Sequence, residues 1–261
     1  MLSYFCRVRR SKTRKSTFYF TLFFAAVLLA SFLVWQHYKN ATTRFVRYPA
    51  FDIELPENYS LHGIDVSHHQ SKINWDEVVK MNVDGVTINF CFIKATEGIE
   101  SVDNRFTNNW QEAERVGMIK GAYHFFNPSR DGILQANNFI RNVSLKKGDL
   151  PPVLDIEHVH GIKTADIQKR IGEWLATVEQ HYHVKPIIYT YADFYERNLA
   201  GKFDDYPLWV AHYLEKNRPG INRNWLFWQH NESGRVNGIS ARVDFNVFNG
   251  DFFDFKRLLI Q

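Results

Sequence analysis

Eight short apolar segments recur along the chain beyond residue 59, and they have the length and composition of β-strands. Each is rich in β-branched or aromatic residues, and in chain order they read LHGIDVS, GVTINFCFIKAT, IKGAYHFF, PPVLDIE, KPIIYTY, PLWVAHY, WLFWQH and VDFNVF. Helical periodicity separates the earlier strands. It is strongest at residues 106–116 and 167–178, where apolar side chains share one helical face, and weaker at 75–81, 132–143 and 192–199.

Strands that alternate with helices predict a parallel sheet with helical crossovers. After the sixth strand the helical pattern stops, and the connections LEKNRPGINRN and NESGRVNGISAR are rich in turn residues. We therefore predict an α/β fold over residues 59–261, a TIM-like barrel with missing helices and the order (β/α)5(β)3. The missing helices account for its length, because a full (β/α)8 barrel typically needs about 250 residues.

The N-terminal part follows a different pattern. Residues 1–15 contain six basic residues and no acid, and an uncharged, largely apolar run extends from there to Lys39. Its apolar part, Phe18 to Trp35, would be about 27 Å long as a helix, close to the ~30 Å hydrocarbon core of a bilayer. We predict a basic cytoplasmic tail (1–15), a transmembrane anchor (16–38) and a linker (39–58).

A cleaved signal peptide is the alternative to this anchor, but the bulky sequence FLVWQHYKN offers no small-residue cleavage site. The prediction is thus a single-pass membrane protein whose barrel is periplasmic or extracellular. Cys6 and Cys91 would then lie on opposite sides of the membrane and could not pair. The net charge of +4 comes from the N-terminal tail, and the remaining 26 basic and 28 acidic residues do not indicate a nucleic-acid binder.

The segment PPVLDIEH places two acids, Asp155 and Glu157, inside a strand-like run, where alternation directs both side chains to one face. Burying unpaired carboxylates is costly, so the structural alternative is pairing with Lys or Arg, or a solvated strand end. Asp65 lies near the end of the first strand, and Asp244 lies in the last strand, which barrel closure would place beside the first. Four acids at one mouth favour a functional role, since barrel chemistry gathers at the carboxyl ends of strands.

Aromatic residues are expected at the same level, although each ring alone is better explained as core than as a ligand platform: Tyr123, Phe125, Tyr189, Tyr191, Trp209 and Trp228. Rings and acids without a basic cluster suit a neutral polyhydroxylated ligand, whereas a phosphate ligand would require Gly-rich loops and basic residues. Adjacent anions oppose double ionisation, so one carboxyl stays protonated and can protonate a glycosidic oxygen. The i, i+2 spacing does not distinguish retaining from inverting geometry.

The motifs GIDVSHHQ, FIKATEG, GAYHFF, VLDIE, PIIYT, LWVAHY, FWQH and VDFNVFNG, over residues 60–250, resemble glycoside hydrolase family 25, the Chalaropsis-type lysozymes. The resemblance implies a barrel lacking a few helices and hydrolysis of the β-1,4 bond between N-acetylmuramic acid and N-acetylglucosamine in peptidoglycan. By motif position, Glu157 would be the general acid, Asp155 would assist the 2-acetamido group, and Asp65 and Asp244 would form the floor. The residues expected to line the sugar groove are Lys94, Glu97, Tyr123, Phe125, Tyr189, Trp209 and Gln229.

A bacterial, membrane-anchored muramidase is therefore expected, with peptidoglycan glycan strands and the membrane as partners, no nucleic acid, and a monomeric state. Four histidines near the acids (His68, His69, His158 and His160) do not have a known zinc-ligand spacing, so no metal or cofactor is predicted. Two alternatives stay open. One is a hydrolase of another N-acetylhexosamine polymer such as chitin, and the other is a glycan-binding barrel without turnover.

Overall fold

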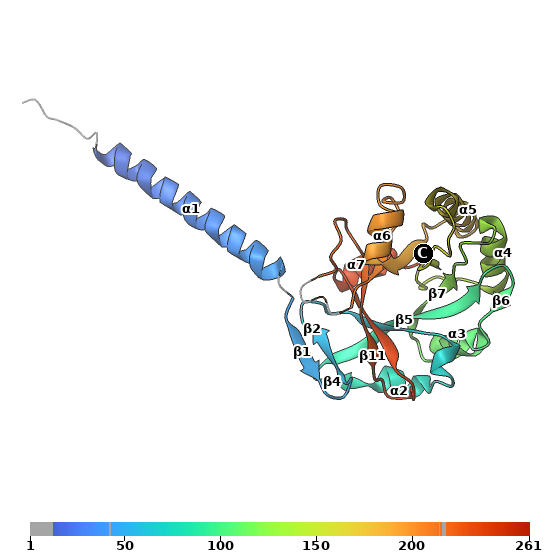
Figure 1. Cartoon of the computed structure of the whole chain (residues 1–261). Coiled ribbons are helices and arrows are strands. Elements are labelled where there is room, and N and C mark those ends of the chain that lie inside the picture. The colour runs from blue at the N-terminus through green and yellow to red at the C-terminus, as the bar shows by residue number, and fades with distance from the viewer. Residues whose placement is uncertain (1–12, 42, 214, 216–217) are drawn as a thin grey trace, which may run out of the picture. The chain divides into compact units, whose positions relative to one another are not determined.

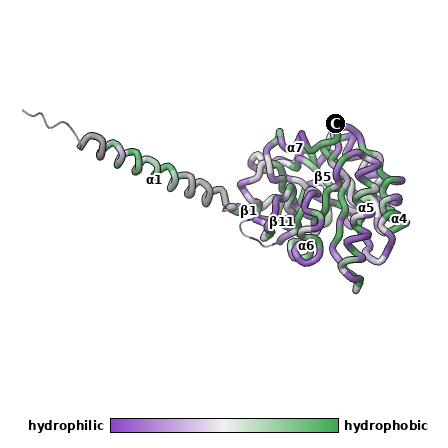
Figure 2. The backbone as a smooth tube through the Cα atoms, turned by 90° about the horizontal axis from the view of Figure 1, so that it is seen from above, coloured by the Kyte–Doolittle hydropathy of each residue, from purple (hydrophilic) through white to green (hydrophobic). Residues whose placement is uncertain are grey.

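The computed structural model describes residues 13–41, 43–213, 215 and 218–261, and the chain divides into two units, Met1–Thr42 and Thr43–Gln261 (Figure 1). The first unit contains one helix, α1 (Thr13–Ala41). Its part with described side chains, residues 18–32, is predominantly hydrophobic (Figure 2). The Phe and Leu side chains of this part are exposed. Within the described residues no helix combines the length and the apolar character needed to cross a membrane. Most of the predicted basic tail lies outside the described residues.

A closed barrel of eight strands forms the centre of the second unit, as the apolar segments predict. Parallel pairing runs from β3 to β11, and β12 pairs antiparallel with both β11 and β3, which closes the barrel. The barrel strands are β3 (His62–Val66), β5 (Val86–Glu97), β7 (Ile119–Phe125), β8 (Val153–Asp155), β9 (Ile187–Tyr191), β10 (Leu208–Ala211), β11 (Phe227–Gly234) and β12 (Val243–Phe248). The short strands β4 (Asn82–Val83) and β6 (Ser101–Val102) pair with the two ends of β5.

Five helices connect the first six barrel strands, which confirms the (β/α)5(β)3 order. They are α2 (Trp75–Lys80), α3 (Phe106–Arg115), α4 (Gly132–Asn142), α5 (Thr164–Tyr182) and α6 (Ala192–Asn198), and a 3-10 turn, η1 (His68–Gln70), precedes α2. The apolar stripes seen in the sequence are their buried faces. In α5, for example, Ile167, Ile171 and Trp174 are completely buried.

The core consists of two layers. One lies between the barrel and its covering elements, and the other fills the barrel interior below the mouth with rings such as Phe90, Phe92 and Phe227. Gly63 and Gly121 make room for these rings, since a Cβ at Gly63 would lie 2.3 Å from a Phe90 carbon and one at Gly121 2.7 Å from a Phe92 carbon.

The prediction that helices stop after the sixth strand is wrong at the C-terminus, because α7 (Phe252–Leu258) follows β12. Asp251 caps this helix by accepting hydrogen bonds from the backbone of Phe253 and Asp254. Phe255 is buried, with its ring 5.0 Å from that of Phe248. The helix therefore closes the rim opposite the strand carboxyl ends.

The prediction of a linker over residues 39–58 is also wrong. Residues 39–41 belong to α1, and β1 (Phe45–Tyr48) and β2 (Ile53–Pro56) form an antiparallel hairpin. Phe51, Ile53 and Leu55 are buried in the core, and the Phe51 ring lies 5.4 Å from that of Phe245 on β12. The hairpin thus covers the outer face of β11 and β12, where the barrel has no helices.

Candidate active site

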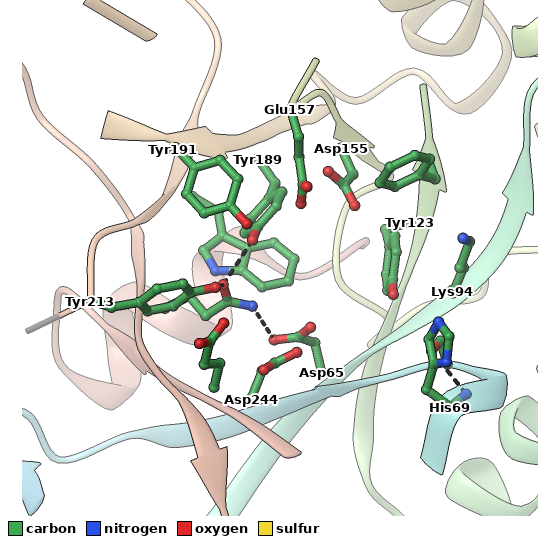
Figure 3. A pocket seen from close by; sticks show the side chains of 15 residues that line it. Asp65, His69, Lys94, Tyr123, Asp155, Glu157, Tyr189, Tyr191, Tyr213 and Asp244 are labelled. Atoms are coloured by element: carbon green, nitrogen blue, oxygen red, sulfur yellow. Dashed lines mark hydrogen bonds between the residues drawn. The ribbon is translucent and has the colours of Figure 1, made fainter. Parts of the chain in front are cut away.

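A cavity of about 240 Å³ opens at the carboxyl ends of the parallel strands (Figure 3). Every strand of the barrel contributes to its lining: Asp65, Ser67, His69, Lys94, Tyr123, Phe125, Asp155, Glu157, Tyr189, Tyr191, Trp209, Tyr213, Gln229, Glu232 and Asp244. All four predicted carboxyls are therefore brought together at one rim.

Of the residues predicted for the sugar groove, only Glu97 does not line the cavity. It lies at the end of the long strand β5, where its half-exposed carboxylate is 2.7 Å from Lys94 Nζ. The Lys94 ammonium also lies 4.6 Å from the centre of the Phe125 ring. Glu97 therefore orients Lys94 from outside the cavity.

Asp155 and Glu157 form the upper carboxyl pair of the cavity (Figure 3). Strand β8 ends at Asp155 and Glu157 lies in the following loop, yet both side chains reach the same cavity. Burial raises the pKa of Asp155 well above its usual range, and the Glu157 charge adds to this effect. Burial also raises the pKa of Glu157. Because adjacent carboxylates oppose double ionisation and both pKa values are raised, this pair favours keeping one proton.

Asp155 is nearly fully buried, and its Oδ1 atom has no hydrogen-bond partner among the described residues. A buried acceptor left without a donor costs free energy. The Asp155 carboxyl lines the cavity, and a ligand N–H or O–H that donates to it would offset part of the cost of its burial. On the outer side, His158 Nε2 lies 3.9 Å from Glu157 Oε2, and a positive charge there favours the ionised form of Glu157.

Asp65 and Asp244 form the lower carboxyl pair. They are direct partners in the β3–β12 register. Asp244 begins β12, and because that strand is antiparallel, its start lies at the rim where β3 ends. Burial raises the pKa of Asp244 to about 10, and the Asp65 charge contributes. Asp65 Oδ2 accepts hydrogen bonds from Gln229 Nε2 at 2.8 Å and Asn246 Nδ2 at 2.7 Å.

A network of side chains fixes both amides against Asp65. The hydroxyl groups of Tyr189 and Tyr213 donate to Gln229 Oε1, and Trp209 Nε1 donates to Asn246 Oδ1 at 2.8 Å. Trp209 itself is 2% exposed and is stacked on Phe92 with ring centres 4.4 Å apart. Its indole therefore offers little surface for the sugar stacking expected from the sequence.

Sequence reasoning missed several residues of the site, including Ser67, His69, Tyr213, Glu232 and Asn246. Asn246 was detectable, because it follows Asp244 by two positions in VDFNVF and so shares its face of β12. Tyr213 comes from the turn-rich segment after β10, and its position depends on tertiary contacts. No group of three or more His, Cys, Asp or Glu side chains in the described part of the chain is arranged to hold a metal ion.

An eight-stranded barrel with missing helices, whose mouth combines two carboxyl pairs with tyrosine rings, belongs to the glycoside hydrolase class of folds and sites. Comparison with known proteins identifies the family. The sequence profile described as glycosyl hydrolases family 25 matches residues 64–239, and the chain belongs to this family.

The relatives support this assignment. The uncharacterized protein YegX of Escherichia coli strain K12 is 46% identical over 201 residues, which cover 77% of this chain and 74% of YegX. Lysozyme M1 of Streptomyces globisporus is 37% identical over 205 residues, 73% of this chain and 68% of that protein. The structure of a family 25 glycosyl hydrolase from Bacillus anthracis superimposes with a TM-score of 0.72 at 34% identity, covering 78% of this chain and 95% of that one.

Proposed function

We propose that this protein is a muramidase that cleaves the β-1,4 bond between N-acetylmuramic acid and N-acetylglucosamine in peptidoglycan, with Glu157 as the general acid. The observation that carries the proposal is the placement of Asp155 and Glu157 together at a tyrosine-lined mouth, where burial raises the pKa of both carboxyls and favours a retained proton. Membership of the family and the similarity to Lysozyme M1 support the substrate class.

The Asp155 carboxyl, which lines the cavity beside Glu157, suits the N–H of a 2-acetamido group as an acceptor. Accepting that hydrogen bond stabilises the Asp155 carboxylate, so the shared proton passes to Glu157. Glu157 then donates this proton to the glycosidic oxygen as the bond to the anomeric carbon breaks. The acetamido carbonyl oxygen attacks the anomeric carbon, and Asp155 stabilises the positive charge that develops on the group. Water, deprotonated by Glu157, later opens this intermediate. Direct attack by water with inversion is the rival mechanism.

The tyrosines of the mouth suit the rest of the sugar. Tyr123, Tyr191 and Tyr213 present rings and hydroxyl groups to the cavity from three different elements. Burial raises the pKa of each above its usual value, so the phenols stay neutral. Tyr123 and Tyr191 can then donate to sugar oxygens, whereas Tyr213, whose O–H is donated to Gln229, can accept from a sugar hydroxyl. Lys94 adds a cation that can pair with a carboxylate of the muramic acid residue.

The test is the reaction of the full chain with purified peptidoglycan and with chitin oligomers, followed by mass spectrometry of the new reducing ends. A muramidase leaves N-acetylmuramic acid at each new reducing end. Faster release from chitin would favour the alternative N-acetylhexosaminidase activity. Stable binding without new reducing ends from either polymer would favour the glycan-binding alternative.

Glu157→Gln tests the assignment of the proton donor. Loss of general acid catalysis typically costs about 10²–10⁴-fold in rate, and the variant should keep its fold and its affinity for glycan. Glu100→Gln is the matched control, because Glu100 is an exposed residue outside the cavity. Wild-type turnover by the Glu157 variant would refute the assignment.

We further propose that α1 anchors the protein in a membrane, with residues 1–15 in the cytoplasm and the barrel on the periplasmic or extracellular side. The apolar, exposed side chains of residues 18–32 and the basic residues that precede them support this placement. Carbonate-washed membranes should retain the intact chain, and protease added outside the cytoplasm should reach the barrel. Recovery of a soluble product lacking residues 1–40 would refute the anchor.

A further inference from the structure

A chain of hydrogen bonds in the cavity floor leads from Trp209 through Asn246 to Asp65, and Trp209 determines which group donates at each step. We infer that Asn246, oriented by the indole of Trp209, is a positioning residue that keeps Asp65 ionised and thereby keeps a proton in the Asp155–Glu157 pair. This inference rests on the proposed function of Glu157 as a proton donor, because only then does the retained proton affect turnover.

The direction follows from the chemistry of the indole. A tryptophan Nε1–H can only donate, so the atom of Asn246 that it contacts at 2.8 Å must be the amide oxygen. The amide nitrogen of Asn246 then faces Asp65 Oδ2 at 2.7 Å, and it can only donate. Gln229 has the matching orientation, in which two tyrosine hydroxyl groups donate to its amide oxygen and its nitrogen donates to Asp65.

Burial raises the pKa of Asp65, and the two N–H donors on its Oδ2 atom oppose this shift because they favour the ionised form. Burial also raises the pKa of Asp244, to about 10, so Asp244 is the carboxyl of the lower pair that keeps its proton. A proton on Asp65 would leave Oδ2 an uncharged and therefore weaker acceptor for both donors. The indole, by holding the Asn246 amide in this orientation, therefore favours the negative charge on Asp65.

The charge on Asp65 acts on the upper pair. A carboxylate nearby opposes further ionisation of both Asp155 and Glu157. Lys94 acts in the opposite direction on both acids, and His158 does so on Glu157. The titratable groups that face Asp65 come from several elements packed around it, namely Asp244, Asp155, Glu157, Tyr123, Tyr189 and Tyr213.

The pH dependence of kcat on peptidoglycan tests the inference, because its alkaline limb reports loss of the proton from the upper pair. Asn246→Leu removes a donor from Asp65, so Asp65 takes up the proton more readily and the alkaline limb should move down by about 1 pH unit. Trp209→Phe frees the amide to turn over and should shift the limb in the same direction. In Asn246→Asp the new side chain donates to Asp65 only while its carboxyl is protonated. The alkaline limb of this variant should therefore begin at a lower pH than in the wild-type protein and should be steeper, because two protons are lost.

Trp174→Phe is the matched control. It removes the same ring and N–H from a buried position, but the Trp174 N–H has no acceptor among the described residues and lies outside the cavity. This variant should lose stability while keeping the wild-type pH profile. A uniform loss of kcat at all pH values in the Asn246 variants, with no shift of the limb, would overturn the inference.

Carboxyl ¹³C NMR separates this inference from the proposed function, because it needs no substrate. At any pH where Asp65 titrates, a larger fraction of it should be protonated in Asn246→Leu than in the wild-type protein. Identical titration of Asp65 in both proteins would overturn the inference even if the enzyme is active. The expected difference in a protein without turnover would instead refute only the proposed function.

Discussion

The N-terminal hairpin provides a direct test of where the folded domain begins. Phe51 lies in the turn between β1 and β2 and is completely buried, with its ring 5.4 Å from Phe245 and 6.1 Å from Tyr48. Phe51→Ala therefore removes a full aromatic side chain from the layer that covers β12. Such substitutions typically cost 3–5 kcal/mol, a figure that includes about 1 kcal/mol for the edge-to-face contact with Phe245.

We expect Phe51→Ala to lower the free energy of unfolding by about 4 kcal/mol. A domain of this size has about 5–15 kcal/mol in total, so the variant should remain folded but lose roughly 8–16 °C in thermal midpoint. Equilibrium unfolding in guanidinium chloride, followed by tryptophan fluorescence, measures the difference. The slope of free energy against denaturant should stay close to that of the wild-type protein, because the same surface unfolds.

Phe253→Ala is the matched control, because Phe253 is 72% exposed on α7 and should change stability by less than about 0.5 kcal/mol. If Phe51→Ala also falls within that margin, the hairpin does not contribute to the core. Residues 43–58 would then behave as the linker that the sequence predicts, and the outer face of β11 and β12 would need another cover.

Three further predictions concern buried charges. Lys120→Met should cost about 3–5 kcal/mol in denaturant unfolding, because it leaves Asp149 buried without the ammonium now 2.6 Å away. The raised pKa of Asp244 makes the free energy of unfolding of the wild-type protein fall as the pH rises. The stability of Asp244→Asn relative to the wild-type protein should therefore be about 2–4 kcal/mol higher at pH 8 than at pH 4. Burial lowers the pKa of His230 to about 3, so below pH 6.5 the unfolded chain binds more protons than the folded one. The free energy of unfolding of the wild-type protein therefore falls as the pH is lowered, by about 2 kcal/mol at pH 5 from this residue. His230→Leu should remove that part of the loss. If the difference in unfolding free energy between variant and wild type does not change with pH, the predictions for Asp244→Asn and His230→Leu are contradicted.

The barrel strands and crossover helices could be predicted because their apolar periodicity is strong and long. The 19 residues of α5 give several turns of a consistent stripe, and each strand is bounded by turn residues. The hairpin and α7 gave no comparable signal. Strands β1 and β2 have 4 residues each and α7 has 7, no fewer than β10 and α6, but they lie outside the alternation of strands and helices that identified those short elements.

The positions of the four acids were predictable from strand ends, but their environment was not. The sequence does not reveal that β12 runs antiparallel to β3. Only that direction places Asp244, which lies near the start of β12, at the same rim as the carboxyl ends of the parallel strands. Glu97 shows the converse case. It belongs to a motif of the family and is paired with the cavity residue Phe125 on β7, yet its carboxylate does not line the cavity and contacts Lys94 instead.

The interior of the barrel divides into two halves with opposite contributions to stability. Below the mouth, rings such as Phe90, Phe92 and Phe227 pack against one another and exclude water, which stabilises the fold. At the mouth, the buried carboxyls of Asp155 and Asp244 have raised pKa values, so their presence costs stability as pH rises toward neutrality. The cost is inseparable from the chemistry, because a carboxyl that ionised freely at neutral pH could not hold the proton that glycoside cleavage needs. Substitutions at the mouth should therefore trade activity for stability, whereas substitutions among the rings should lose stability first.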